Sequence, residues 1–411
     1  MKLEYFITKR LVTTKNYKSS VSAPIIKIAI TAIALGMIMM LISVATGLGL
    51  KYKIRDKISA FSGHIVITNY DSNVTDITLK PIDISVVQSD DIKNIKGVKK
   101  IQSYASKAGI IRTEDSFEGI IYKGVDSLYD LNEIKDYLIE GRLPKSADGM
   151  SNEVLLSQYI ADRMHFKVGD KITTYFMKEW GNKIPNVRQF EIVGIYNSAL
   201  QQFDANIVIG DIKHVQRLNR WKPNEVGGFE VVLNSFDQIE QKGQEFYMNL
   251  PSTVDSKTIV DKYSNVFGWI DMFDFNIKII IIIMIAVASI NMIVALLVLI
   301  LERTQMIGIL KAMGADNWTI RKVFLYNATY LIVKGLFYGN LIGLGLLYIQ
   351  QYFGLIKLDS TAYYVREAPV LIRFSDVFLL NLGVVVIAFL VLLIPSYMIT
   401  KISPIKAIRY D

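Results

Sequence analysis

The sequence predicts an α+β membrane protein, with four transmembrane helices and a large mixed α/β domain inserted between helices 1 and 2. Four almost uncharged runs, near residues 28–50, 279–301, 324–353 and 377–398, predict the helices. The longest stretch between them, residues 51–276, mixes charges with turns and contains no such run. With 51% hydrophobic residues in 411, the composition fits a chain that is partly in the membrane and partly in water.

The chain begins with a basic amphipathic segment that leads into the first span. In residues 1–23, five basic side chains alternate with leucine, isoleucine and phenylalanine, which predicts a helix on the anionic cytoplasmic surface of a membrane. The first span, 24–50, contains about 23 uncharged residues, enough to cross a hydrocarbon core of about 30 Å. A cleaved signal peptide is the alternative, but its apolar region is normally only about 7–15 residues long. We therefore expect an uncleaved anchor.

Residues 51–276 predict a folded domain with its own core. Alternating segments predict strands at 64–68, 109–112, 119–122, 190–194 and 229–233. Helical patterns lie between them at 84–95, 157–165, 211–218 and 235–247. The mixture predicts antiparallel or mixed sheets. Because the sequence has no cysteine, the domain has no disulfides to hold it.

The remaining spans fix the expected sidedness of the chain. We expect spans at 277–301, 323–353 and 377–399, a loop at 302–322, a short outer loop at 354–376, and a tail at 400–411. Lysine and arginine flank the spans in the N-terminal segment, in the 302–322 loop and in the tail, and four crossings put all three on one side. The positive-inside rule makes that side the cytoplasm and places the 51–276 domain outside. This topology also explains the net charge of +8, so nucleic acid is not an expected partner.

The third and fourth spans contain residues that interrupt a plain apolar pattern. Lys334 either reaches the membrane interface or faces other protein chains, and the pattern leaves both open. Gly335, Gly339 and Gly343 recur on one helix face, which predicts a close approach of another helix. Pro395 interrupts the end of the fourth span.

The motifs of a catalytic or metal centre are missing from the sequence. It contains no G-x-x-x-x-G-K-[ST], no G-x-S-x-G and no cysteine nucleophile. His64, His165 and His214 lie in separate segments without the spacing of metal ligands. The spans carry no acidic residue, which argues against an ion-driven carrier. We expect a chain that is not an enzyme and binds neither metal nor cofactor.

The loop between the second and third spans has the most regular short pattern. Met306, Ile309, Leu310 and Met313 recur at i, i+3, i+4 and i+7, which predicts an apolar stripe on a short helix that ends at Gly314. Asp316 is placed to cap the following helix. The stripe either packs on the chain's own helices or docks in the groove of a partner, where methionine gives an adaptable contact.

Residues 302–315, ERTQMIGILKAMGA, resemble the signature of the FtsX/MacB superfamily of ABC transporter permeases. Pro395 together with residues 404–410 resembles the C-terminal motif of the same superfamily. In the large domain, segments 140–144, 168–171 and 190–194 are most similar to the lipoprotein-releasing permeases of the LolC/LolE type. The resemblance extends over nearly the whole chain.

This resemblance implies a non-catalytic permease subunit in the bacterial inner membrane, with both termini in the cytoplasm and the large domain in the periplasm. Two permease chains, identical or homologous, would sit on a separate LolD-like ABC ATPase that binds ATP and Mg²⁺. The helix in the 302–315 loop would couple to that ATPase through Glu302, Arg303, Met306, Ile309, Leu310, Met313 and Gly314. The complex would extract lipoproteins from the membrane and pass them to a periplasmic chaperone by mechanotransmission, without a central pore.

Residues 177–187 resemble the protruding hook with which LolC-like chains hold the chaperone. Met177, Trp180, Ile184 and Pro185 would supply the contact, since aromatic anchors dominate the energetics of interfaces. An ordinary long hairpin is the alternative interpretation of this segment.

Two other functions remain open within the same superfamily. One is a MacB-like efflux permease, which would expel peptides or drugs through an outer-membrane duct. The other is an FtsX-like signalling permease that regulates cell-wall hydrolases. We expect such signalling chains to be shorter, with a smaller first outer domain, so the lipoprotein-releasing function is favoured.

Overall fold

The computed structural model describes residues 22–72, 75–145, 149–177 and 184–403. Its described residues form two compact units. The membrane unit comprises the parts within 1–51, 269–357 and 367–411, and the inserted unit comprises the parts within 52–268 and 358–366. Most of the predicted surface helix at 1–23 and the C-terminal motif at 404–410 lie outside the described residues.

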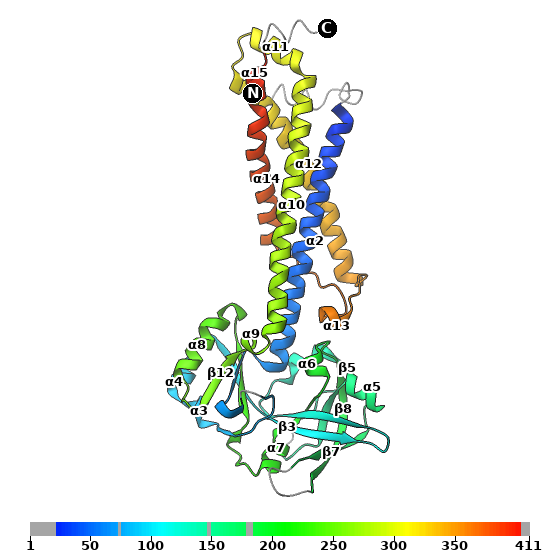
Figure 1. Ribbon diagram of the computed structural model, residues 1–411, viewed down its shortest axis with the longest axis vertical. Coiled ribbons are helices and arrows are strands. Elements are labelled where there is room, and N and C mark those ends of the chain that lie inside the picture. The colour runs from blue at the N-terminus through cyan, green and yellow to red at the C-terminus, as the bar shows by residue number, and fades with distance from the viewer. Residues whose placement is uncertain (1–21, 73–74, 146–148, 178–183, 404–411) are drawn as a thin grey trace. The chain divides into compact units, whose positions relative to one another are not determined.

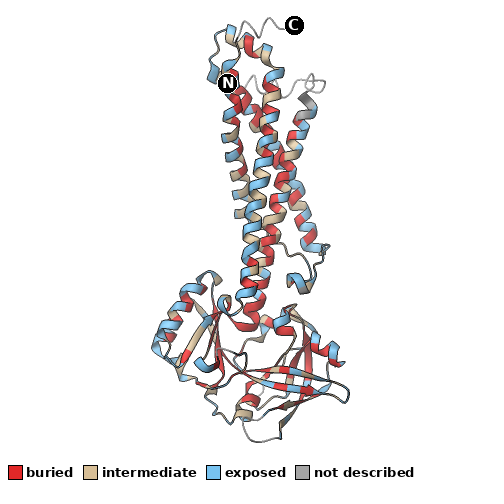
Figure 2. Cartoon of the chain, in the orientation of Figure 1, coloured by how far each residue is buried: buried red, intermediate tan, exposed pale blue. Residues whose placement is uncertain are grey.

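The four predicted spans are confirmed as helices that are long and apolar enough to cross a membrane. Within the described residues these are α2 (Ser22–Ser62), α10 (Ser264–Glu302), α12 (Asn317–Phe353) and α14 (Phe374–Ser396). They run alongside one another in Figure 1. Two short helices complete the unit, α11 (Thr304–Ala312) between α10 and α12, and α15 (Met398–Lys401) after α14. Exposed residues line the spans along their length (Figure 2), as a lipid-facing surface requires.

The first two membrane helices are longer than their apolar runs. We expected helices at 24–50 and 277–301, but α2 continues to Ser62 and α10 already begins at Ser264. Neither extension contains proline, so nothing in the backbone stops the helix there. Lys51 and Asp274 form an ion pair, with Nζ 2.6 Å from Oδ2, just beyond the two apolar runs. Apolar composition therefore marks the lipid-facing length of these helices and not their ends.

Glycines on α12 allow close contact with α2. A Cβ atom added to Gly335 would lie 2.7 Å from the Cβ of Ile33, and one added to Gly339 would lie 2.7 Å from the Cβ of Met37. At Gly343 the added atom would lie 3.0 Å from a methyl carbon of Leu41. Real Cβ contacts below 3.0 Å are essentially absent from proteins, so this spacing needs glycine at the first two positions.

The inserted unit is built on a mixed β-sheet. Its strands are β1 (Ile65–Asn69), β3 (Val98–Arg112), β4 (Phe117–Val125), β5 (Leu138–Gly141), β6 (Glu153–Ser157), β7 (Lys171–Phe176), β8 (Asn186–Tyr196), β9 (Ile207–Asp211), β11 (Gly228–Leu233) and β12 (Val254–Thr258). A small separate pair is formed by β2 (Ile82–Asp83) and β10 (Glu225–Val226).

Pairing in the large sheet closes on itself in one part of the unit. The strand order is β12-β1-β11-β3-β4-β9-β6-β8-β5, and β7 pairs with both β3 and β8. Strands β3, β4, β9, β6, β8 and β7 therefore form a closed circuit. The β4–β9 and β6–β8 pairs are parallel and the other pairs of the circuit are antiparallel. This confirms the mixed sheet. Each strand of the circuit is paired on both sides, so among the described strands of this sheet the free edges are left to β12 and β5.

Short helices connect the strands of the inserted unit. They are α3 (Ser85–Gln88), α4 (Asp90–Lys93), α5 (Gln158–Met164), α6 (Gln201–Asp204), α7 (Ile212–Asn219), α8 (Ile239–Asn249), α9 (Ile259–Lys262) and α13 (Ser360–Tyr363), together with 3₁₀ turns η2 (Tyr70–Ser72), η3 (Leu131–Tyr137) and η4 (Phe236–Gln238). The single helix expected at 84–95 is two helices, because Ser89 has an extended backbone with φ −60° and ψ 148°.

Part of the outer loop between α12 and α14 belongs to the inserted unit. We expected residues 354–376 to be a short connection, but residues 358–366 pack with the inserted unit. Lys57 holds this segment, because its Nζ donates to the carbonyl oxygens of Ser198 at 2.6 Å and Tyr364 at 2.9 Å. Lys57 is 6% exposed, and burial lowers its pKa to about 8. A buried amine therefore joins α2 to two loops of the unit.

Candidate functional site

The connection between α10 and α12 is a compact turn that presents α11. Gly314 has φ +90°, a left-handed conformation that glycine adopts without strain, and it ends α11. The carboxylate of Asp316 accepts hydrogen bonds from the backbone N–H groups of Trp318 and Thr319, both at 3.1 Å. It thereby caps α12, as the sequence predicted.

The residues of the predicted apolar stripe lie on two different faces of α11. Met306 and Leu310 are partly buried and pack against the core of the membrane unit, next to the fully buried Ile307. Ile309 and Met313 instead point outward, with 46% and 72% of their surface exposed. One face of α11 therefore packs on the chain's own helices, and docking to a partner stays a prediction for the exposed face.

Two residues at the start of the connection were also predicted to take part. Glu302, the last residue of α10, is exposed, and Arg303 is half-buried between α10 and α11. Both residues directly precede α11 in the chain. The exposed Ile309 and Met313 suit a docking contact, since methionine adapts to irregular partner surfaces.

Lys311 ties α11 to the segment that follows the fourth span. Its Nζ donates hydrogen bonds to the carbonyl oxygens of Ile399 at 2.7 Å and Ile402 at 2.8 Å. Desolvation lowers the pKa of Lys311. Arg321 adds a second link, because it donates to Ser396 Oγ at 3.0 Å. The apolar periodicity did not mark Lys311, although its place four residues after the buried Ile307 puts it on the inner face.

The β7–β8 hairpin carries exposed apolar side chains at its described ends. Strand pairing runs from Lys171 opposite Glu191 to Phe176 opposite Asn186. Beyond it, Met177 and Ile184 are 68% and 71% exposed, and Pro185 is half-buried. Trp180, the predicted aromatic anchor, lies outside the described residues. The hairpin therefore offers an apolar base for a contact, while its tip is not described.

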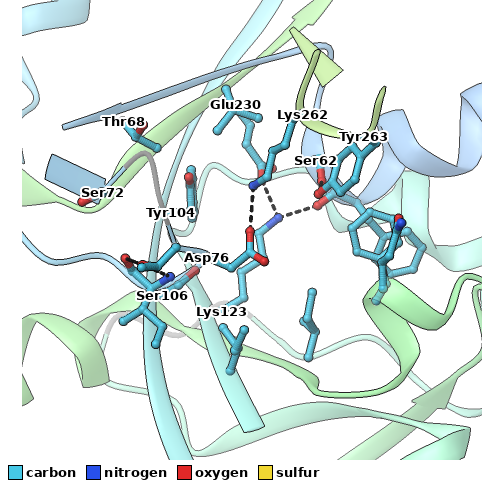
Figure 3. Close-up of a pocket in the computed structure, with 18 of the residues that line it drawn as sticks. Ser62, Thr68, Ser72, Asp76, Tyr104, Ser106, Lys123, Glu230, Lys262 and Tyr263 are labelled. Atoms are coloured by element: carbon cyan, nitrogen blue, oxygen red, sulfur yellow. Dashed lines mark hydrogen bonds and ion pairs between the residues drawn. The ribbon is translucent and has the colours of Figure 1, made fainter. Parts of the chain in front are cut away.

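A polar cavity of about 990 Å³ lies within the inserted unit (Figure 3). Its lining comes from the end of α2, from strands β1, β3, β4 and β11, and from α9. Two ion pairs contribute, Lys123 with Glu230 at 2.6 Å and Lys262 with Asp76 at 3.1 Å. Figure 3 shows hydroxyl groups of Ser62, Ser106 and two tyrosines around them.

The Lys123–Glu230 pair is a structural contact, and both charged groups form hydrogen bonds inside the protein. Lys123 Nζ also donates to the carbonyl oxygen of Phe61 at 2.6 Å, and the hydroxyl of Tyr129 donates to Glu230. Burial lowers the pKa of Lys123, and burial is also the main reason why the pKa of Tyr129 is raised. Because these hydrogen bonds are made inside the protein, the pair links the end of α2, at Phe61, to the sheet.

The histidines have packing or surface positions. His214 is fully buried and its Nε2 lies 2.8 Å from the carbonyl oxygen of Ser151. His64 Nδ1 accepts a hydrogen bond from the N–H of Leu233, whereas His165 is exposed. Across the described residues, no group of three histidine, aspartate or glutamate side chains has the arrangement of a metal site.

Comparisons with known proteins agree with this architecture. The family described as MacB-like periplasmic core domain matches residues 28–262, and the family described as FtsX-like permease C-terminal matches residues 278–404. The chain is 20% identical over 395 residues to the lipoprotein-releasing system transmembrane protein LolC of Xylella fastidiosa, covering 93% of each chain. It is 20% identical over 421 residues to the LolE protein of the corresponding system in Haemophilus influenzae, covering 99% of each.

Among solved structures, the periplasmic region of MacB from Actinobacillus actinomycetemcomitans matches with 14% identity and a TM-score of 0.34. The match covers 50% of this chain and 92% of that one. The first family spans more than half of the chain and contains the first membrane helix and the sheet, and the second contains the remaining spans with α11. The chain therefore belongs to the ABC transporter permeases that combine a MacB-like periplasmic core domain with an FtsX-like permease C-terminal domain.

Proposed function

We propose that this chain is the permease subunit of an ATP-driven transporter that extracts lipoproteins from the bacterial inner membrane. The exposed pair Ile309 and Met313 on α11 is the observation that carries the proposal. These side chains lie on a short helix whose other face packs against the membrane unit, so a partner bound there pushes on the spans. The occupant is a separate ABC ATPase that binds ATP and Mg²⁺, since this sequence has no phosphate-binding loop of its own.

Force from the ATPase enters the spans through the contacts of α11. Met306 and Leu310 transmit it by packing, and Lys311 transmits it to the end of the fourth span through hydrogen bonds. A second permease chain, identical or homologous, completes the pair that the two ATPase subunits drive. The chain itself performs no catalytic step.

The named relatives favour lipoproteins over peptides, drugs or a signalling role, because they are called lipoprotein-releasing proteins. Extraction of an acyl chain from lipid costs about 0.8 kcal/mol per CH₂ group, so it needs the external work that ATP supplies. The basic residues near the span ends support a cytoplasmic position of the termini and a periplasmic position of the inserted unit. There, Met177 and Ile184 at the base of the β7–β8 hairpin are exposed for contact with a lipoprotein chaperone.

The test replaces the outward side chains of α11 with a charge. Ile309→Asp and Met313→Asp should each weaken ATPase association by about tenfold or more, because a carboxylate would be buried in an apolar contact. The measurements are co-purification of the ATPase, stimulation of ATP hydrolysis, and release of lipoprotein from proteoliposomes to a soluble chaperone.

A matched control introduces the same charge at an exposed leucine of the other unit. Leu128 is 86% exposed, so Leu128→Asp should leave association, hydrolysis and release unchanged. Full ATPase association and release in both α11 variants would refute the coupling role. Normal coupling to ATP hydrolysis in the unmodified complex, with lipoproteins left in the membrane, would refute the cargo.

A further inference from the structure

The membrane unit contains an apolar groove between α2, α10 and α14. Its volume is about 360 Å³, and its walls include Val44 and Leu48 of α2, Ile281 and Ile285 of α10, and Leu380 of α14. The surface that lines it is almost entirely apolar, except at one end. The shape and the apolar lining of the groove therefore suit a hydrocarbon chain rather than a polar ligand.

The length of the groove matches one leaflet of a bilayer. Its lining on α10 extends from Asp274 to Ile285, which corresponds to about 16 Å at the rise of an α-helix. The hydrocarbon core of a whole bilayer is about 30 Å thick, so the groove spans roughly half of it. A lipid in that leaflet would place its head group beside the charged end.

The charged end of the groove contains two groups of opposite sign, Asp376 and Lys278, that form no ion pair within the described residues; Oδ1 of Asp376 accepts a hydrogen bond from Ser375 Oγ at 3.3 Å. Asp274 is already satisfied by Lys51. By contrast, Oδ2 of Asp376 is buried and has no hydrogen-bond partner, and Lys278 is exposed and forms no ion pair within the described part of the chain. A buried carboxylate oxygen without a donor is costly, so the groove lacks a donor for Oδ2 of Asp376.

We propose that the groove binds one zwitterionic phospholipid that carries a primary ammonium group. An acyl chain lies along the apolar walls, the ammonium donates hydrogen bonds to Asp376, and the phosphate binds Lys278. An anionic lipid would satisfy Lys278 but bring no cation to Asp376. An apolar helix of a second copy would cover the walls and leave both charges unpaired. The inference depends on the groove alone and not on the release of lipoproteins.

Native mass spectrometry of the purified full-length chain in detergent tests this site. The probes are phosphatidylethanolamine, phosphatidylcholine and phosphatidylglycerol with identical acyl chains. The wild-type chain should retain one phosphatidylethanolamine with about tenfold preference over the other two, the factor expected for one charge-assisted hydrogen bond. Asp376→Asn should remove the preference over phosphatidylcholine, whose quaternary ammonium has no N–H to donate.

Further variants test the phosphate contact and the apolar walls, and a control distinguishes loss of binding from loss of folding. Lys278→Gln should weaken retention of all three phospholipids, and Gly383→Leu, which fills the groove, should abolish retention. Asp271→Asn changes an exposed carboxylate of α10 that does not line the groove and should behave as the wild type. Circular dichroism of each variant checks that the helices are intact.

Three results would overturn the proposal. The first is equal retention of the three phospholipids by the wild-type chain, and the second is an unchanged preference in Asp376→Asn. The third is efficient disulfide crosslinking between chains through Leu379→Cys, which would mean that a second copy covers the groove. The chain has no native cysteine, so such a crosslink reports on this position alone.

Discussion

The inserted unit has a cluster of aromatic rings in its core, whereas two helices of the membrane unit meet at glycines. In the inserted unit, Tyr122, Phe176 and Phe190 are at most 1% exposed, and the rings of Tyr122 and Phe190 stack at 5.0 Å. In the membrane unit, the contact between α12 and α2 uses Gly335 and Gly339, which bury almost no side-chain surface. Water drives bulky groups together in the first unit, whereas helices already surrounded by lipid gain from close fit instead.

The buried polar contacts of the two units differ in the same way. The inserted unit buries the charged pair Lys123 and Glu230, with further hydrogen bonds from Tyr129 and to Phe61. The membrane unit instead pairs two neutral amides, Asn340 of α12 and Asn381 of α14, through reciprocal hydrogen bonds of 2.7 and 3.0 Å. We therefore expect loss of one partner to be far more costly in the inserted unit.

The largest effect is expected at the buried ion pair. Lys123→Met would leave the carboxylate of Glu230 buried without its cation, which should cost about 3–5 kcal/mol in the free energy of unfolding. Urea titration of the full-length chain, with hydrogen exchange of β4 and β11 as the signal, measures this loss. The double variant Lys123→Met with Glu230→Gln should recover part of it, because no unpaired charge remains. A single variant as stable as the wild type would contradict the structural role.

A larger side chain at the contact between α12 and α2 should cause the next largest loss of stability. A side chain at Gly339 would meet the Cβ of Met37 at 2.7 Å and the carbonyl oxygen of Ala34 at 2.9 Å. Gly339→Val should therefore separate α12 from α2 and cost about 3 kcal/mol, at the upper end of typical overpacking penalties. Gly345→Val is the control, since an added Cβ there has no neighbour within 4 Å. Equal thermal midpoints in detergent for both variants would mean that the helices do not depend on this contact.

Protonation of His64 in the inserted unit should lower the free energy of unfolding by about 2 kcal/mol as the pH falls from 7 to 5. Burial lowers its pKa from 6.5 to about 4, and its Nδ1 must stay unprotonated to accept from Leu233. Between pH 6.5 and about pH 4, His64 is protonated in the unfolded chain but not in the folded chain. The stability that the neutral His64 contributes is therefore complete above pH 6.5 and is lost as the pH falls through this range. From pH 7 to pH 5 the loss should be about 2 kcal/mol.

The measurement for His64 is hydrogen exchange of β1 and β11 at several pH values. His64→Gln should lose less stability on acidification than the wild type, because it has no proton to gain. His165→Asn is the control, since His165 is exposed and asparagine tolerates its left-handed backbone. An identical pH dependence in all three proteins would exclude His64 as the cause.

The sequence was informative wherever one segment carries its own pattern. Apolar runs predicted all four spans, and alternation predicted the central strands β3, β4 and β8. The closed circuit was not predictable, because β7 pairs with β3 far from it in sequence. In the same way, Lys123 and Glu230 are 107 positions apart, and nothing local marks them as a pair.

Within the candidate site, the sequence identified the helix but not the direction of each side chain. Periodicity joined Met306, Ile309, Leu310 and Met313 into one stripe, yet the stripe is wide enough to divide between the core and solvent. Which half is buried depends on where the other spans pass, and that is not encoded in the loop itself. Lys311 was missed for the same reason, since its acceptors are carbonyl oxygens and leave no sequence pattern.

The smallest effect is expected at the amide pair of the membrane unit. Asn381→Leu should cost only about 0.6 kcal/mol, the average found for polar contacts between membrane helices, because Asn340 finds other partners when the helices separate. In this structure Asn340 already donates to the carbonyl oxygen of Leu336 at 2.7 Å, so one of its bonds survives the change. The double variant Asn340→Leu with Asn381→Leu measures the coupling between the two amides in thermal unfolding. A coupling as large as that of Lys123 with Glu230 would mean that polar contacts matter equally in both units.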